Sequence, residues 1–188
     1  MKKLYLIGNA HIDPVWMWRW QEGFAEIKAT FKSALDRMNE FEDFKFTSAC
    51  ACYYQWVEKN APDMFDEICK RVKEGRWEIA GGWYIQPDCN IPSGESFARQ
   101  GLYSQRYFRE KFGKIAKTGY NVDSFGHNGN LPQILKKAEW TIMFFQDRVR
   151  TKRICMGMYF GGKARMAAVF LHHVFRMHIA LAEMTQNL

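Results

Sequence analysis

Long hydrophobic runs are absent from this 188-residue sequence, and nowhere do apolar residues approach the roughly 20 in succession that a membrane-spanning helix needs. Cysteines are few, five in all, and none forms the Cys-x-x-Cys pairs that are typical of thiolate zinc sites. The start, Met-Lys-Lys-Leu-Tyr-Leu-Ile-Gly, resembles a signal peptide, but polar residues soon interrupt its apolar run. We therefore expect a cytoplasmic protein with reduced thiols and no membrane partner.

Lys and Arg outnumber Asp and Glu, which gives a net charge of +7. Much of this excess lies in residues 139–188, which hold 7 Lys and Arg against 3 Asp and Glu. Because positive and negative charges are nearly balanced over residues 1–138, we expect no nucleic-acid partner, despite the general affinity of basic clusters for phosphate. Hydrophobic residues make up 47% of the chain, which indicates a folded core rather than a disordered chain.

Strand-like and helix-like segments alternate over residues 4–138. Short apolar runs predict strands at 4–8, 44–49, 77–81 and 117–123, whereas apolar spacings of three and four predict helices at 22–38, 53–74 (broken near Pro62), 96–112 and 131–138. This alternation predicts an α/β domain with a mainly parallel sheet, either open or rolled toward a barrel. Functional sites in such sheets gather beyond the carboxyl ends of the strands.

A histidine and an aspartate follow the first predicted strand in His11-Ile12-Asp13-Pro14-Val15-Trp16. Positions i and i+2 of an extended segment point to the same face, so the imidazole and the carboxylate lie side by side. Both are ligands that zinc accepts. The alternative is a structural pair in which Asp13 begins the next helix and His11 hydrogen-bonds to it.

A second carboxylate, Asp123, stands at the end of the last predicted strand, in Asn-Val-Asp-Ser-Phe-Gly-His. It could complete a cluster with His11 and Asp13 if the strands adjoin, or it could be an ordinary turn or helix-cap aspartate. Between the two motifs, residues 81–96 form a long connection rich in aromatic and polar side chains, which is typical of functional loops. Its aromatic residues suit stacking on sugar rings, although Trp83 and Tyr84 could simply belong to the core.

Taken in this order, the three segments resemble the α-mannosidases of glycoside hydrolase family 38. The resemblance rests on the His-x-Asp-Pro-x-Trp start, the Gly-Gly-Trp-Tyr…Pro-Asp-Cys-Asn…Ser-Gly-Glu-Ser loop and the Asp-x-Phe-Gly-His segment. It implies a partial seven-stranded β/α-barrel-like domain and retaining hydrolysis of terminal α-linked mannose in a mannoside or oligosaccharide. It also implies site residues: His11, Asp13 and Asp123 as ligands of one Zn²⁺, Asp123 as the nucleophile, and Trp16, Phe125 and the loop residue Asp88 as contacts of the substrate.

The resemblance ends near residue 138, so we divide the chain into residues 1–138, the front part of a catalytic domain, and residues 139–188, an atypical tail. That tail holds six of the ten methionines, and out-of-frame translation would explain it. The family takes its fourth zinc ligand and its acid/base carboxylate from segments that are not matched here. We therefore expect the chain alone to be inactive, with a metal-dependent polysaccharide deacetylase, or a non-catalytic fragment that retains sugar or metal affinity, as the alternatives.

Overall fold

A computed structural model describes residues 7–149, 152–159 and 165–169, with side chains described as far as Thr141 and at Met143. The helices are α1 (Trp20–Glu40), α2 (Ala51–Asn60), α3 (Pro62–Lys73), α4 (Gly94–Phe112) and α5 (Leu131–Lys137). The strands are β1 (Gly8–Asn9), β2 (Phe46–Ser48), β3 (Trp77–Ile79), β4 (Thr118–Ser124), β5 (Ile142–Val149), β6 (Lys152–Tyr159) and β7 (Arg165–Val169). The predicted helices and the alternation of elements are confirmed; of the predicted first strand, residues 4–6 lie outside the described residues.

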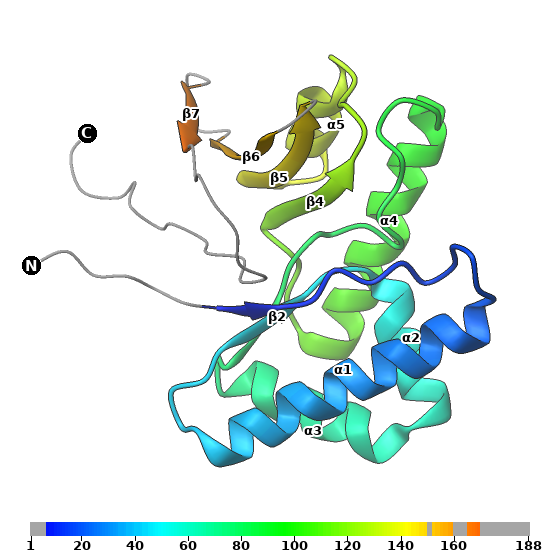
Figure 1. Cartoon of the computed structure of the whole chain (residues 1–188), viewed down its shortest axis with the longest axis vertical. Helices are drawn as coiled ribbons and strands as arrows, with labels where there is room; N and C mark the ends of the chain where they lie inside the picture. The colour runs from blue at the N-terminus through cyan, green and yellow to red at the C-terminus, as the bar shows by residue number, and fades with distance from the viewer. Residues whose placement is uncertain (1–6, 150–151, 160–164, 170–188) are drawn as a thin grey trace, which may run out of the picture.

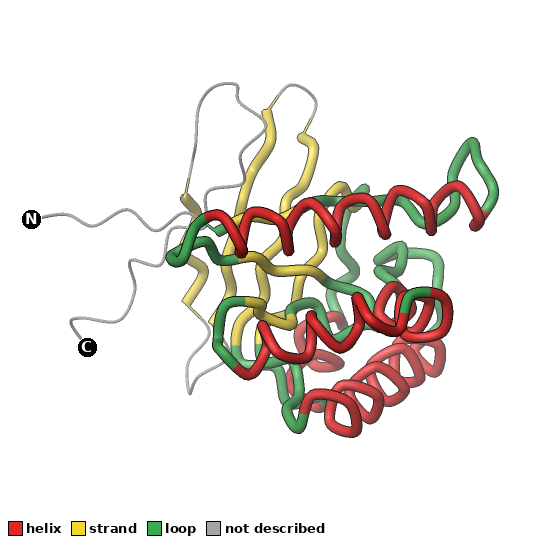
Figure 2. The backbone as a smooth tube through the Cα atoms, turned by 90° about the horizontal axis from the view of Figure 1, so that it is seen from below, coloured by secondary structure: helices red, strands yellow, loops and turns green. Residues whose placement is uncertain are grey.

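The described strands form two sheets. One has three parallel strands in the order β1-β2-β3, and the other has four strands in the order β4-β5-β6-β7. A parallel bridge between Gly81 and Gly119 joins the continuation of β3 to β4. Figure 2 shows the strands lying next to one another, and Figure 1 shows α1, α2 and α3 on one side of β2.

The fold is α/β as predicted, but the described residues do not form a seven-stranded barrel. The pairing of β4 with β5 is parallel, whereas β5–β6 and β6–β7 are antiparallel. Only two residues separate Val149 from Lys152. A parallel return needs a crossover of a dozen residues or more, so a connection this short permits only an antiparallel partner.

Aromatic side chains fill the main core between the helices and the first sheet. Phe31 of α1 and Phe46 of β2 both pack on Trp77 of β3, with ring centroids 5.0 and 4.8 Å apart, and Tyr54 of α2 donates its hydroxyl to Ser48. A smaller cluster joins Trp83 to Trp140 at a centroid distance of 4.3 Å. Trp140 is therefore part of the core, although it lies beyond the predicted boundary at residue 138.

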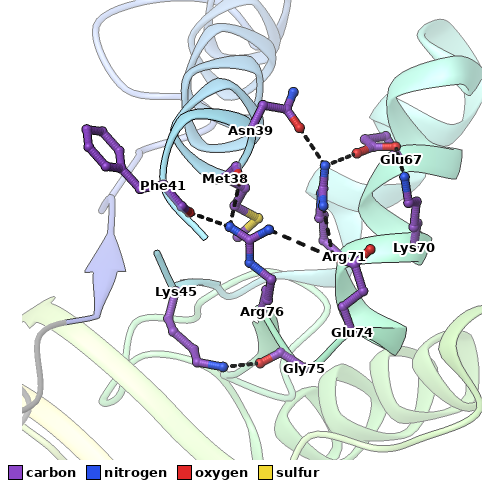
Figure 3. Close-up of polar contacts among 10 residues, drawn as sticks. All are labelled: Met38, Asn39, Phe41, Lys45, Glu67, Lys70, Arg71, Glu74, Gly75 and Arg76. Atoms are coloured by element: carbon purple, nitrogen blue, oxygen red, sulfur yellow. Dashed lines mark hydrogen bonds and ion pairs between the residues drawn. The ribbon is translucent and has the colours of Figure 1, made fainter. Parts of the chain in front are cut away.

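Two arginines, Arg71 and Arg76, lie at the amino end of β3, opposite the end where the predicted site lies (Figure 3). Arg76 donates to the Met38 and Phe41 carbonyls at 2.7 and 2.6 Å, where α1 ends. Arg71 pairs with Glu67 and Glu74 along α3 at 2.6 and 2.9 Å. Because the last carbonyls of a helix lack partners within it, Arg76 stabilises this end of α1 and fixes it against β3.

Candidate functional site

The two predicted halves of the site lie at the carboxyl ends of parallel strands. His11 follows β1, and Asp123 is the penultimate residue of β4. The Tyr120 hydroxyl of β4 donates to the Asn9 side chain at 2.6 Å, and Asn9 donates to the Thr47 carbonyl of β2 at 2.8 Å. These side-chain contacts link β4 to β1, so both halves of the site lie at the carboxyl ends of strands that are in contact.

His11 and Asp13 lie close together, as predicted. His11 Nε2 is 3.5 Å from Asp13 Oδ1; this nitrogen is buried and has no hydrogen-bond partner among the described residues. Helix α1 begins only at Trp20, with Arg19 as its N-cap, so the alternative in which Asp13 begins a helix is wrong. A buried imidazole nitrogen that lies beside a carboxylate and lacks a hydrogen-bond partner among the described residues is chemically suited to a cation between the two groups.

The backbone around this pair is held from two sides. The Tyr53 hydroxyl of α2 donates to the Ile12 carbonyl at 2.6 Å, and the Trp18 indole donates to the Asp13 carbonyl at 3.1 Å. Burial raises the pKa of Tyr53 and keeps this hydroxyl protonated as a donor. The Tyr53 contact therefore anchors the segment that bears the pair to α2.

A small cavity of about 50 Å³ lies beside the pair. Its lining includes His11, Asp13, Tyr53, Gln86 and Tyr120. This space is sufficient for a water molecule or an ion with part of its hydration, but it is too small for a sugar ring. A sugar would have to bind above it, at the open edge of the sheet.

Asp123 has an unusual backbone conformation. Its φ is 58°, in the left-handed region, and the pairing of β4 with β5 shifts register between Val122 and Ser124. Asp123 lies within a strand, so it is not a helix cap; the N-cap of α5 is Asn130. Non-glycine residues held in this region are uncommon and are concentrated at functional sites.

The three predicted zinc ligands do not form a closed cluster. Among the described residues, no group of three or more His, Cys, Asp and Glu side chains is arranged to hold a metal ion. The structure pairs His11 with Asp13 and places exposed Asp123 near the carboxyl end of β4. The zinc site with Asp123 as third ligand therefore stays a prediction.

The predicted substrate contacts have different environments. Trp16 and Phe125 are 62% and 72% exposed. Asp88 is also exposed, and its Oδ1 accepts the N–H groups of Asn90 and Ile91 at 2.7 and 2.9 Å, which lowers the pKa of this carboxyl. One oxygen of Asp88 is thus engaged in a turn, and the role of all three residues in binding sugar stays a prediction.

Three residues that build the site were not predicted from the sequence: Asn121, Gln86 and Gly23. Trp83 is a core residue, as one alternative held, and its indole donates to Asn121 Oδ1 at 2.6 Å. Asn121 is fully buried on β4, and Gln86 hydrogen-bonds to Val122.

Gly23 of α1 lies against Pro14, where a Cβ would be 2.0 Å from the Pro14 carbonyl oxygen. The position of polar Asn121 between Tyr120 and Val122 was the available signal. The partner of Gln86 is distant in sequence, and no local pattern predicts the contact of Gly23 with Pro14.

Comparison with known proteins decides the family. The profile of the glycosyl hydrolases family 38 N-terminal domain matches residues 1–152. The chain belongs to glycoside hydrolase family 38. Alpha-mannosidase G of Dictyostelium discoideum is 35% identical to it over 134 residues, which are 71% of this chain and 12% of that protein. Alpha-mannosidase of Saccharomyces cerevisiae is 32% identical over 137 residues, 72% of this chain and 13% of that protein.

Solved structures agree with this family 38 membership. The crystal structure of an alpha-mannosidase from Enterococcus faecalis has a TM-score of 0.70 and 25% identity, and the match covers 77% of this chain and 16% of that one. The family 38 chain therefore spans only about an eighth to a sixth of the length of these relatives. The deacetylase alternative is not favoured by any of these matches. No helix in the described ranges is both long and apolar enough to cross a membrane.

Proposed function

We propose that this chain forms the front part of the catalytic domain of a retaining, zinc-assisted α-mannosidase, which removes terminal α-linked mannose from a mannoside or oligosaccharide. The observation that carries the proposal is the buried His11 Nε2, which lies 3.5 Å from Asp13 Oδ1 without a hydrogen-bond partner among the described residues. Family membership and the placement of Asp123 at the same edge of the sheet support it.

A zinc ion fits the donor set of this edge, because an imidazole nitrogen and carboxylate oxygens are its usual ligands. His11, Asp13 and Asp123 would hold it. When bound, zinc would orient the mannose ring through adjacent hydroxyls and favour their partial negative charge. A fourth protein ligand would come from beyond the motifs matched in this chain.

Asp123 acts as the nucleophile in this proposal. Its carboxylate oxygen forms a bond to the anomeric carbon while the bond to the leaving oxygen breaks. A second carboxyl group, protonated and about 5–5.5 Å away, gives its proton to that oxygen and becomes a carboxylate. This second group, now a carboxylate, then takes a proton from water while the water oxygen bonds to the anomeric carbon and the bond to Asp123 breaks, which releases mannose with retained configuration. Trp16 and Phe125 stack on the sugar, and Asp88 binds a hydroxyl through its second carboxylate oxygen.

The proposal is tested in a longer protein that joins this segment to the rest of a family 38 catalytic domain. We expect release of aryl α-mannosides, loss of activity with a chelator, and a fall in kcat on the order of 10³-fold or more for Asp123→Asn. Asp43→Asn, an exposed carboxylate away from the site, is the control and should leave kcat unchanged. Unaltered turnover in Asp123→Asn, or release of acetate instead of mannose, would contradict the proposal.

A second candidate is a non-catalytic fragment that keeps some affinity for metal or sugar, and the small share of its relatives' length favours it for the chain alone. Zinc binding by the 188-residue chain without turnover of any aryl mannoside would assign it this role.

A further inference from the structure

Gln86 contacts the strand that carries Asp123. Strand β3 ends at Ile79, and its continuation bridges β4 only through Gly81 and Gly119 among the described residues. Further along β4, the Gln86 side chain makes the hydrogen bonds to the β4 backbone that a neighbouring strand would otherwise make. Its Oε1 accepts the Val122 N–H at 3.1 Å, and its Nε2 donates to the Val122 carbonyl at 2.7 Å. Both polar backbone groups of Val122, a residue only 2% exposed, are thereby satisfied.

The residue after Val122 is Asp123, whose φ of 58° departs from the extended backbone of β4. Such a conformation persists in a non-glycine residue only where the neighbouring backbone is held firmly. Ser124, on the other side, is also held, because Asn121 Nδ2 donates to its hydroxyl oxygen at 3.1 Å. Asp123 is therefore fixed from both flanks, by Gln86 through Val122 and by Asn121 through Ser124.

Gln86 is itself anchored close to the His11–Asp13 pair. Its backbone N–H donates to Cys50 Sγ at 3.2 Å, and Gln86 and Cys50 line the same cavity as His11 and Asp13. The residue thus connects the pair after β1 with the strand that bears the third carboxylate.

We propose that Gln86 is a positioning residue that holds Asp123 in its left-handed conformation and so sets the direction in which this carboxylate leaves β4. The part of Asp123 as a ligand and nucleophile rests on the function proposed above. The effect of Gln86 on the Asp123 backbone does not depend on that function.

The chain contains a matched control at the other end of β4. Gln105 of α4 makes the same pair of contacts with Ala116, donating to its carbonyl at 2.8 Å and accepting its N–H at 2.9 Å. Gln105 and Gln86 are both half-buried. Ala116 precedes β4, so loss of the Gln105 contacts removes identical chemistry without touching the neighbourhood of Asp123.

The test compares Gln86→Leu with Gln105→Leu in the 188-residue chain by NMR. We expect Gln86→Leu to raise amide exchange at Val122 at least tenfold and to move the Asp123 φ, read from couplings and chemical shifts, into the extended region. Gln105→Leu should raise exchange at Ala116 and leave Asp123 unchanged. Gln86→Glu, which keeps the acceptor for the Val122 N–H but loses the donor, should show a smaller change and serves if Gln86→Leu fails to fold. An unchanged Asp123 φ in the Gln86 variants would overturn the inference.

A titration with Co²⁺, followed by its visible absorption, separates the inference from the proposed function. If the wild-type chain binds Co²⁺, Gln86→Leu should weaken binding about 10- to 100-fold and alter the spectrum, whereas Gln105→Leu should do neither. Equal Co²⁺ spectra and affinities for wild type and Gln86→Leu would overturn the positioning role. If the wild type binds no Co²⁺, the proposed zinc site fails, and the Asp123 φ still decides whether Gln86 holds this backbone.

Discussion

Single residues at this edge of the sheet combine polar groups with deep burial. Cys50 is an example: it is 2% exposed, has a φ of 72°, and accepts the Gln86 N–H. Burial raises the pKa of its thiol from 9.0 to about 11. Because burial penalises the thiolate, Cys50 stays protonated and is inert toward thiol reagents near neutral pH.

Alkaline pH should therefore destabilise the fold through Cys50. Its folded-state pKa is raised, so its contribution is fully present below the unfolded pKa of about 9 and is lost as the pH rises toward 11, by up to about 3 kcal/mol. Denaturant unfolding of wild type and Cys50→Ser, measured from pH 7 to 10.5, checks this. The variant should lose less stability over pH 9–10.5; parallel curves would show that Cys50 does not titrate in the way described.

Helices and strands were largely predictable from the sequence because their periodicity is local. The apolar spacing of α1 places Ile27, Phe31 and Leu35 in the core, and α3 begins at Pro62, one residue after the break that follows α2. The sheet arrangement was less predictable, since a barrel and two linked sheets begin from the same alternation of elements. Contacts such as that of Gln86 with Val122 join residues 36 positions apart, and no local sequence pattern predicts them.

Gly23 shows how one helix position determines the placement of the site. Ala is ordinarily favoured over Gly inside a helix by about 1 kcal/mol. At Gly23, however, a Cβ would lie 2.0 Å from the Pro14 carbonyl oxygen, so Gly23→Ala must displace the segment that bears Asp13. We expect net destabilisation of about 1–3 kcal/mol in denaturant unfolding and weaker metal binding.

Gly101 of α4 is the matched control for Gly23. A Cβ there would meet Ala138 at 3.6 Å, an ordinary contact. Gly101→Ala should be neutral or stabilising by up to about 1 kcal/mol. Equal effects of the two substitutions would contradict the contact described for Pro14.

The whole chain exposes apolar surface near the site. Four exposed apolar side chains lie there, and we call them the 15–20 surface: Val15 (56% exposed), Trp16 (62%), Met17 (82%) and Trp20 (48%). Strand β1 lies at an edge of its sheet as described. Exposed apolar patches and strand edges favour association between copies, so we expect the isolated chain to be weakly stable and prone to aggregation.

Met17→Lys should slow this aggregation, as measured by light scattering during mild heating, because it places a charge in the 15–20 surface. The free energy of unfolding should change by less than about 0.5 kcal/mol, since Met17 is exposed. Ile91→Lys is the control: Ile91 is 84% exposed but lies outside this surface. A reversible, cooperative melt of a monomeric wild type, or equal protection by both variants, would contradict the prediction.

The most direct test of the account is calorimetric titration of the 188-residue chain with Zn²⁺. We predict one ion per chain, with affinity reduced at least tenfold by each of His11→Ala, Asp13→Asn and Asp123→Asn and unchanged by Asp43→Asn. Absence of binding, or binding that is indifferent to these three substitutions, would contradict the convergence of His11, Asp13 and Asp123 on one cation.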